Sequence, residues 1–297
     1  MSPPSDDRVA IFLNEDAASA RSPRVRETVE LARRVLHADL HVVATRDQET
    51  LRGWLEERMG PYRTAIIAGG DGSLGIAFNV AAPRDVTLGY IPAGFGNATA
   101  HLLGLPRQPE ALVTVLASGE RRPTDLVAVD GRLALFAGAG WDAAVAGRYA
   151  AGGAKRLRGW AAAVVGSGGE LVRRHRARVE ADGRLVHDGP FELLVAGTTP
   201  FYGRGMIVNP GARADGGRLM LRAYPGPAPL LALEAARWFL HATPAARGIP
   251  AERVTISATD GRPIPLQADG DLLGIRNEWE VLIAPAAVRL IGRLPRG

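Results

Sequence analysis

The feature that most constrains this chain is an apolar segment that runs directly into a glycine-rich turn. Ala65 to Ala68 forms the apolar run, Gly69-Gly70-Asp71-Gly72-Ser73 follows it, and the helical pattern Leu74 to Val80 comes next. Glycine permits backbone angles and close approaches that side chains forbid, and the first amides of a helix are unsatisfied donors at its positive end. The order strand, glycine turn, helix therefore predicts either a phosphate-binding turn or a tight connection without a ligand.

The first 119 residues alternate between short apolar runs and amphipathic segments. This alternation predicts a parallel, doubly wound sheet with helices on both faces. The expected strands are 9–13, 40–44, 64–68 and 86–91, and the expected helices are 25–36, 49–59 and 74–80.

In such a sheet, ligands bind beyond the carboxyl ends of the strands. Four segments are expected to meet there: Asn14, Thr45, Gly69 to Ser73, and Pro92 to Asn97. The last of these, Pro92-Ala93-Gly94-Phe95-Gly96-Asn97, is a second glycine turn between a strand and a helix. Its amides are predicted to close the other side of a phosphate site.

The second half of the chain has a different texture. Asp-Gly pairs at 130, 182, 188, 215, 260 and 269 separate short runs rich in Val, Leu, Ile and Phe, which is typical of hairpins. We therefore expect an α/β domain over 1–122 and an antiparallel β-sandwich over 123–283, with helical inserts near 143–174 and 229–241. The second insert is amphipathic, which leaves both core packing and membrane contact open.

Composition narrows the function classes. The net charge is +5, almost all positive charge is arginine, and Lys155 is the only lysine, so anionic partners such as nucleotides and acidic lipids are favoured. No nucleic-acid-binding motif accompanies the arginines, and we expect no nucleic-acid partner. The chain has no cysteine and no apolar run of eighteen residues, and it does not begin with a secretory signal pattern. We expect a cytoplasmic protein without a membrane-spanning segment.

Three segments in order resemble the diacylglycerol kinase catalytic-domain family, which includes bacterial lipid kinases and sphingosine kinases. They are Gly69-Gly70-Asp71-Gly72-Ser73, then Pro92 to Ala98, then Gln267-Ala268-Asp269-Gly270-Asp271. The first motif is shared with NAD kinases and phosphofructokinases, whereas the other two favour lipid kinases. Similar segments between them extend the likeness over nearly the whole chain: Thr124 to Leu126, Gly138 to Ala143 and Gly211 to Gly217.

The resemblance implies an ATP- and Mg²⁺-dependent kinase that phosphorylates a lipid hydroxyl at a membrane surface. It also implies that ATP lies between the two domains, that segment 284–297 returns to the first domain, and that the protein attaches peripherally to the inner membrane face. The lipid acceptor, diacylglycerol-like or sphingoid-like, and the oligomeric state stay open.

Candidate roles follow from the needs of phosphoryl transfer together with the resemblance. Asp269 is the candidate base on the acceptor hydroxyl, Asp271 is a metal or orienting carboxylate beside it, and Asp71 is the candidate Mg²⁺ ligand. The resemblance also implies a metal role for Asp215, because in some bacterial relatives an acid at this place helps to bind a structural Mg²⁺. The expected nucleotide contacts are Asn14, Thr45, Gly69, Gly70, Asp71, Gly72, Ser73, Gly94, Gly96, Asn97 and Lys155.

Each role has a structural alternative. Asp269 and Asp215 also fit plain Asp-Gly turns, Asp71 fits a local turn residue, and Asn97 fits a helix cap. The first loop, Asn14 to Ala20, carries two acids and no glycine where relatives have glycine, and Ile76 and Phe95 replace polar residues of the family pattern. These departures support the alternative hypothesis of a degenerate member that binds nucleotide or lipid without transfer. A kinase for a soluble acceptor such as NAD is the third hypothesis.

Overall fold

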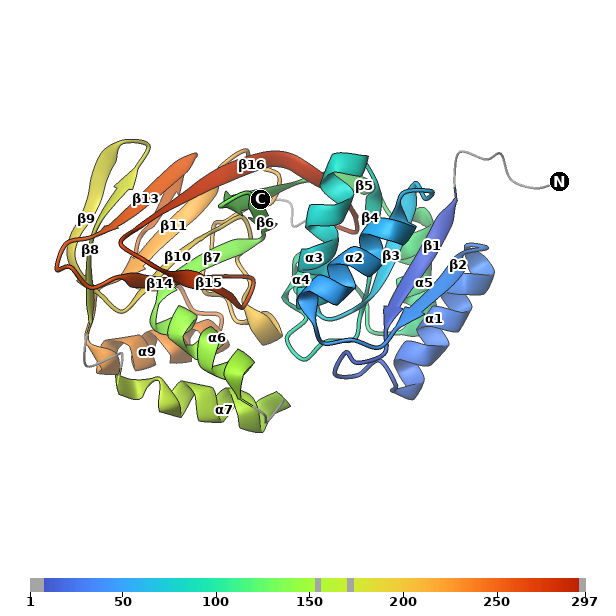
Figure 1. Cartoon of the computed structure of the whole chain (residues 1–297), viewed down its shortest axis with the longest axis horizontal. Helices are drawn as coiled ribbons and strands as arrows, with labels where there is room; N and C mark the ends of the chain where they lie inside the picture. The colour runs from blue at the N-terminus through green and yellow to red at the C-terminus, as the bar shows by residue number, and fades with distance from the viewer. Residues whose placement is uncertain (1–7, 153–155, 170–173, 294–297) are drawn as a thin grey trace. The chain divides into compact units, whose positions relative to one another are not determined.

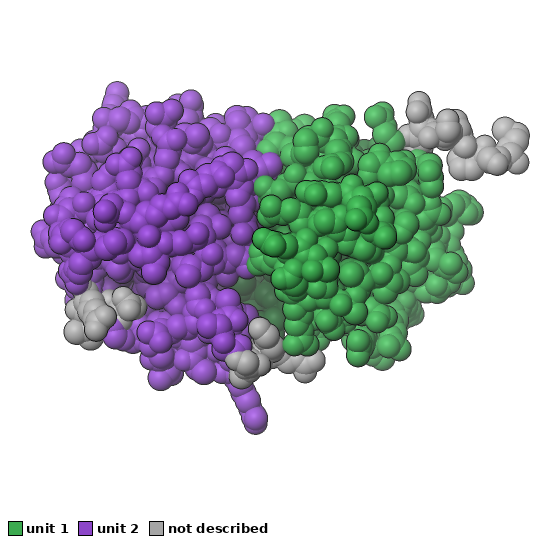
Figure 2. Space-filling view, in the orientation of Figure 1, with its two compact units in different colours: residues 1–124, 203–205, 286–297 green, residues 125–202, 206–285 purple. Residues whose placement is uncertain are grey.

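The computed structural model describes residues 8–152, 156–169 and 174–293 (Figure 1). The chain divides into two compact units, which Figure 2 distinguishes by colour. Unit 1 comprises Met1–Thr124, Gly203–Gly205 and Ala286–Gly297, and unit 2 comprises Asp125–Tyr202 and Met206–Pro285. The chain passes from unit 1 to unit 2 within strand β5 (Arg121–Val129) and returns within strand β16 (Glu278–Ile291).

Unit 1 is a parallel sheet with helices on both faces (Figure 1). Its strands follow the order β2-β1-β3-β4, and the end of β16 pairs in parallel with β4. The elements are β1 (Val9–Asn14), α1 (Pro23–Val35), β2 (Asp39–Val43), α2 (Gln48–Met59), β3 (Thr64–Gly69), α3 (Asp71–Ala81), the 3₁₀ turn η1 (Ala82–Arg84), β4 (Thr87–Pro92), α4 (Ala98–Leu102), α5 (Pro109–Ser118) and the 3₁₀ turn η2 (Gly203–Gly205).

Burial and helix capping explain why these residues form the strands and helices of unit 1. Every residue of β3 and β4 is buried, as expected for central parallel strands covered on both faces. Helix α1 begins at Ser22, whose hydroxyl accepts a hydrogen bond from the Val25 amide, and Pro23 occupies its first turn. Val25, Val29 and Ala32 of α1 then pack with α5 against one face of the sheet. Helices α2 and α3 pack on the other face.

Unit 2 contains two antiparallel sheets and a layer of helices (Figure 1). One sheet has the order β12-β11-β10-β7-β14-β15, and in the other the first part of β16 pairs with β13, followed by β8 and β9. The elements are β6 (Arg132–Ala134), β7 (Phe136–Gly140), α6 (Trp141–Ala151), α7 (Arg156–Gly166), β8 (His175–Ala181), β9 (Arg184–Phe191), β10 (Leu193–Gly197), β11 (Leu219–Tyr224), α9 (Ala228–Phe239), β12 (Gly248–Ala251), β13 (Arg253–Ala258), β14 (Ile264–Ala268) and β15 (Asp271–Arg276).

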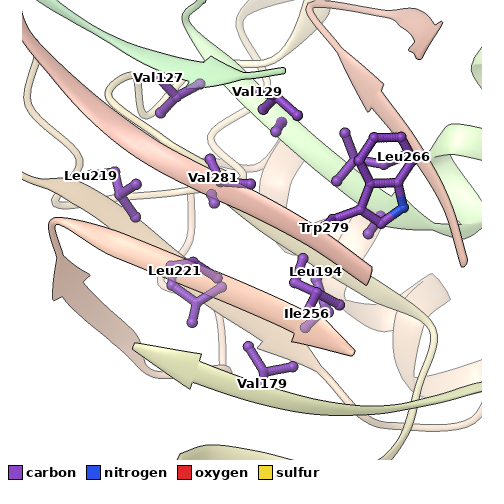
Figure 3. Close-up of a cluster of buried hydrophobic side chains, with 14 of the residues drawn as sticks. Val127, Val129, Val179, Leu194, Leu219, Leu221, Ile256, Leu266, Trp279 and Val281 are labelled. Carbon is purple, nitrogen blue, oxygen red and sulfur yellow. The ribbon is translucent and has the colours of Figure 1, made fainter. Parts of the chain in front are cut away.

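The two sheets of unit 2 enclose one apolar core (Figure 3). Leu194 and Leu221 enter it from the first sheet, Val179 and Ile256 from the second, and Trp279 of β16 fills its end. The indole N–H of Trp279 donates to the Ile264 carbonyl oxygen at 2.8 Å, so its polar atom is satisfied inside the core. The expected fold class, an α/β domain followed by an antiparallel β-sandwich with helical inserts, is confirmed.

The Asp-Gly pairs form hairpin turns at three of the six positions. Asp130, Asp182 and Asp269 each have φ near 50°, each is followed by a glycine with positive φ, and each pair joins two adjacent antiparallel strands. The hairpin prediction is wrong at Asp188, which lies within β9 and pairs with Arg178. There the strand continues because Gly189 is accommodated inside the ladder.

The helical inserts lie together on the outer face of the β12-to-β15 sheet (Figure 1). Leu231 and Trp238 of α9 pack against Leu193 and Val195 of that sheet, and Trp141 of α6 joins the same cluster. Among the described residues, no helix combines the length and the apolar character needed to cross a bilayer.

Candidate functional site

The two glycine turns of unit 1 pack directly against each other. The Ala93 amide, at the start of the second turn, donates to the Gly69 carbonyl oxygen of the first at 2.7 Å. A Cβ placed on Gly94 would lie 2.7 Å from the Gly70 Cα and 2.8 Å from the Asn97 Oδ1. Backbone cannot yield to such a contact, so a glycine at position 94 is required for the two turns to meet.

Gly72 differs from these packed glycines. A Cβ at this position would meet no protein atom within 4 Å. Gly72 lies in the first turn of α3, where the amides have no intrahelical acceptor, and Gly70 precedes the helix without a side-chain cap. The outer surface of this turn is therefore open backbone with unsatisfied donors, which is the arrangement that accepts an anion.

Asp71 joins the two turns through its carboxylate. Its Oδ2 accepts a hydrogen bond from the Ala98 amide at 3.1 Å, and its Oδ1 accepts from the amide and the hydroxyl of Thr99 at 3.1 and 3.2 Å. Removal from water raises the pKa of Asp71, although these donors stabilise its charged form. Asp71, and not Asn97, therefore caps α4.

The side chain of Asn97 makes its hydrogen bonds within and beside the glycine turn to which it belongs. It has φ of 49°, its Oδ1 accepts from the Gly94 amide and the Tyr90 hydroxyl, and its Nδ2 donates to the Gly94 carbonyl oxygen. Asn97 occupies the N-cap position of α4, as the structural alternative predicts, but its side chain makes no capping hydrogen bond. Asn97 instead holds the shape of the turn that carries Gly94 and Gly96.

The two remaining predicted segments reach the same edge of the sheet. Asn14 donates to the Thr45 carbonyl oxygen at 2.9 Å and accepts from the Thr45 amide at 3.3 Å, which ties the ends of β1 and β2 together. The Ser19 amide of the first loop donates to the Ala93 carbonyl oxygen at 2.8 Å. Ser73 lies beside Gly69, where a Cβ would be 2.8 Å from the Ser73 Cβ. The structure thus brings together all four segments that the sequence predicted to meet.

Arg204 belongs to this edge and was missed by sequence reasoning. Its amide donates to the Gly96 carbonyl oxygen at 2.8 Å, and its guanidinium carbon lies 5.1 Å from the centre of the Phe95 ring. The side chain is exposed, and no carboxylate of the described residues pairs with it. The only sequence signal was an arginine between two glycines, Gly203 and Gly205.

In unit 2, Asp269 occupies the β14–β15 hairpin turn. Its carboxylate accepts hydrogen bonds from the Leu135 amide at 3.0 and 3.1 Å and from the Phe136 amide at 3.2 Å. Asp271, two residues further on, forms an ion pair with Arg132 at 2.5 Å. Each carboxylate is therefore held in place by groups of unit 2, Asp269 by two backbone amides and Asp271 by Arg132.

A buried polar group supports the Asp269 turn. The Gln267 amide nitrogen donates to Asp142 Oδ2 at 2.9 Å, while Gln267 Oε1 accepts from the Gly270 amide at 2.7 Å. The Tyr202 hydroxyl also donates to Asp142, at 3.3 Å. Burial raises the pKa of Asp142 to about 7, and these hydrogen bonds oppose only part of that shift. Gln267 was not predicted, because its partner lies 125 residues away.

Two predicted residues add no contact to these groups among the described residues. Asp215 forms an ion pair with Arg213 at 3.1 Å. Lys155 lies outside the described residues. Among the residues that the structure describes, no group of three or more His, Asp or Glu side chains could hold a metal ion by itself. A divalent ion at Asp71 would therefore need further oxygen ligands from a bound phosphate or from water.

Comparisons with known proteins agree with this fold. A family model described as the diacylglycerol kinase catalytic domain matches residues 8–129. A Pseudomonas aeruginosa protein named "Probable lipid kinase YegS-like" is 30% identical over 230 residues, covering 74% of this chain and 73% of that protein. A protein named diacylglycerol kinase from Mycobacterium tuberculosis is 31% identical over 170 residues, 52% of each chain. A solved diacylglycerol kinase structure from Bacillus anthracis has a TM-score of 0.73 at 16% identity and covers 99% of both chains.

Proposed function

The chain belongs to the diacylglycerol kinase catalytic-domain family, and we propose that it transfers the γ-phosphate of ATP to the hydroxyl of a membrane lipid. The acceptor class is diacylglycerol-like or sphingoid-like, since both offer a hydroxyl beside an apolar body. The observation that carries the proposal is the pair of packed glycine turns, with the open helix start at Gly72 beside them.

The phosphate chain of ATP fits the open surface of the first turn of α3. Unsatisfied amides and the positive end of an eleven-residue helix favour an anion there, and no side chain at Gly72 occupies the space. Arg204, exposed on Phe95 beside Gly96, supplies a cation that can pair with phosphate oxygens. Asn97 contributes by keeping Gly94 and Gly96 in position.

Mg²⁺ fits the same edge at Asp71. The carboxylate accepts hydrogen bonds from Ala98, Thr99 and the Asn97 backbone, and its Oδ2 lies 3.3 Å from the Cβ position of Gly96, toward the second glycine turn. When bound, Mg²⁺ would neutralise charge on the phosphates during transfer. Asp71 would hold the ion through that oxygen while its other hydrogen bonds fix the carboxylate.

Asp269 is proposed to accept the proton of the lipid hydroxyl. Two backbone amides orient its carboxylate, and Gln267 braces the turn from the side of Asp142. Asp271 is held by Arg132 and is proposed to orient the acceptor or a metal-bound water. In this proposal the residues of unit 1 bind the donor and those of unit 2 act on the acceptor.

The test is phosphoryl transfer by the purified full chain, with labelled ATP, Mg²⁺ and a mixed bacterial lipid extract. The expected result is a labelled lipid whose formation Asp269→Asn abolishes. Asp182→Asn is a matched control, because Asp182 occupies the same kind of Asp-Gly turn and its carboxylate also accepts two backbone amides, those of Glu252 and Arg253. This variant should transfer phosphate at the wild-type rate.

Three other outcomes would contradict parts of the proposal. Normal transfer by Asp269→Asn would show that Asp269 is a turn residue and not the base. ATP binding without transfer to any lipid would favour the degenerate family member. Phosphorylation of NAD in place of lipid would identify a kinase for a soluble acceptor.

A further inference from the structure

One oxygen of Asp142 accepts two side-chain hydrogen bonds. Asp142 lies in the first turn of α6, which packs beside β14 and β15 (Figure 1). Its Oδ2 accepts from the Gln267 amide nitrogen at 2.9 Å and from the Tyr202 hydroxyl at 3.3 Å. Gln267 belongs to β14, and Tyr202 lies in the loop that follows β10. This single oxygen therefore joins three separate segments of unit 2.

Gln267 connects Asp142 to the backbone beside Asp269. The Gln267 side chain is buried, and its Oε1 accepts from the Gly270 amide at 2.7 Å while its amide nitrogen donates to Asp142. Gly270 follows Asp269 in the β14–β15 turn and has φ of 91°. A buried amide group that lacks hydrogen bonds costs free energy, so loss of the acceptor at Asp142 would favour another orientation of Gln267. The turn would then lose its hydrogen bond at Gly270.

Tyr202 connects Asp142 to the other side of the same turn. Its ring stacks on the Phe136 ring, with 4.0 Å between the ring centres and an interplanar angle of 25°. The Phe136 amide donates to the Asp269 carboxylate at 3.2 Å, and the Phe136 carbonyl oxygen accepts from the Asp269 amide at 3.1 Å. The two branches thus reach Asp269 from both sides and close a loop of contacts through Asp142.

Strand β7 leaves room for this arrangement at Gly138. A Cβ at Gly138 would overlap Asp142 Oδ2 and would lie 2.6 Å from the Gln267 amide nitrogen. The start of α6 is also fixed to the sheet, because the Trp141 amide donates to the Glu192 carbonyl oxygen at 2.9 Å. Any side chain at position 138 would therefore separate Asp142 from Gln267.

We propose that Asp142 is a positioning residue that fixes the Asp269 carboxylate for phosphoryl transfer. It acts through the two hydrogen bonds on its Oδ2. Its second oxygen, Oδ1, is enclosed, which argues against direct contact with a substrate. A base must lie within hydrogen-bond reach of the proton that it accepts, and small displacements of such a group lower the rate by large factors. The inference rests on the proposed role of Asp269 as the base.

The test compares two variants of Asp142 by steady-state kinetics, with ATP and the lipid that the extract assay labels. Asp142→Leu keeps the shape of the side chain without an acceptor, so kcat should fall on the order of 100-fold while both KM values stay within ~2-fold. Asp142→Asn restores an acceptor oxygen, and its kcat should stay within ~3-fold of the wild type. Burial raises the pKa of Asp142 to about 7, so the neutral amide copies the protonated form of the carboxyl group.

Gln267→Met is an independent variant that removes the same hydrogen bond from its other end. It should lower kcat about as much as Asp142→Leu, and the double variant should be no slower than either single variant, because the two residues act as one unit. Asp182→Leu is the matched control. Its carboxylate accepts two backbone amides in a different Asp-Gly turn, so its loss should lower stability and leave kcat unchanged.

Amide hydrogen exchange followed by NMR reports on the turn without any turnover. The Gly270 amide, whose acceptor is Gln267 Oε1, should exchange at least ~10-fold faster in Asp142→Leu and in Gln267→Met than in the wild type. Asp142→Asn and the Asp182→Leu control should keep the wild-type exchange rate at Gly270. If Asp142→Leu does not fold, Gln267→Met provides both the kinetic and the exchange measurement.

Other results would overturn the inference. Unchanged kcat in Asp142→Leu and Gln267→Met would exclude a positioning role, and an equal loss in Asp142→Asn would show that the hydrogen bonds on Oδ2 are not what matters. A raised KM for the lipid at constant kcat would make Asp142 a substrate contact. If the wild type transfers no phosphate, or Asp269→Asn transfers normally, the proposed function fails, and exchange at Gly270 still decides whether Asp142 holds the turn.

Discussion

Asp142 should make unit 2 less stable as the pH rises, and Asp142→Asn should remove that dependence. Its carboxyl group has a pKa raised from 3.8 to about 7, and its Oδ1 is enclosed without a hydrogen-bond partner among the described residues. Because the raised pKa favours the protonated form in the folded state, the full contribution to stability is present below about pH 4. It is lost as the pH rises toward 7, where the unfolded chain has already released its proton.

The size of the stability loss follows from how far the pKa of Asp142 is raised. About three pKa units at ~1.4 kcal/mol each give a loss of about 4 kcal/mol between roughly pH 4 and pH 7, which is an upper bound because the residue is only half-buried. Asparagine has nearly the same shape, its oxygen can accept from Gln267 and Tyr202, and it cannot ionise. Near pH 8 the variant should therefore be more stable than the wild type by about 2–4 kcal/mol, and near pH 4 the two should be close.

Urea unfolding of both proteins across this pH range, followed by tryptophan fluorescence, measures the difference. Asp182→Asn is a control of opposite sign, because hydrogen bonds from the Arg253 and Glu252 amides lower the pKa of Asp182. Its loss should destabilise the protein at neutral pH, and the effect should vanish as the pH falls below the ordinary value for an aspartate. A stability difference between Asp142→Asn and wild type that does not change with pH would refute the assignment of a neutral carboxyl group at this position.

Two further predictions concern the edge of unit 1 where we propose that ATP binds. Gly72→Ala and Gly53→Ala both place a methyl group in open space on a helix, so each should raise the free energy of unfolding by up to ~1 kcal/mol. Only Gly72→Ala should weaken ATP binding, by about 10-fold or more as measured by calorimetry. Equal ATP affinity in the two variants would mean that no phosphate lies on that turn. Arg204→Gly should lower ATP affinity by about 5–10-fold without loss of stability, because Arg204 has φ of 64°, whereas Arg184→Gly should leave ATP affinity unchanged.

The sequence alone predicted those structural features that depend on residues close together in the chain. The strand, glycine turn and helix at Ala65 to Val80 follow from apolar periodicity and from the glycines, and the alternation of such units implies the parallel sheet. The convergence of Asn14, Thr45 and the two glycine turns follows from topology alone, since the carboxyl ends of parallel strands share one edge. These predictions needed no knowledge of side-chain contacts.

Features that depend on contacts between distant residues were not predictable in this way. The Gln267–Asp142 hydrogen bond joins residues 125 positions apart, and nothing around either residue marks the other. The hydrogen bonds between the Asn97 side chain and the amide and carbonyl of Gly94 were not predicted, and the nucleotide contact predicted for Asn97 stays a prediction. Asp188 was assigned to a turn because an Asp-Gly pair is a turn signal, and the pairing of β8 with β9 on both sides of it prevailed.

Phe95 shows how one departure from the family pattern acquires a meaning only in three dimensions. In the sequence, the phenylalanine replaces a polar residue in a turn predicted to bind phosphate, which counts against nucleotide binding. In the structure, its ring supports the guanidinium of Arg204, whose left-handed backbone a glycine would adopt more easily. Arg204 has a strained backbone, and its exposed side chain stacks on an aromatic ring beside Gly96. Pairing with a phosphate would explain why an arginine occupies this position. If ATP binds at this turn as proposed, the two residues together replace a neutral polar group by a positive charge, and the departure at Phe95 then favours an altered nucleotide contact over a lost one.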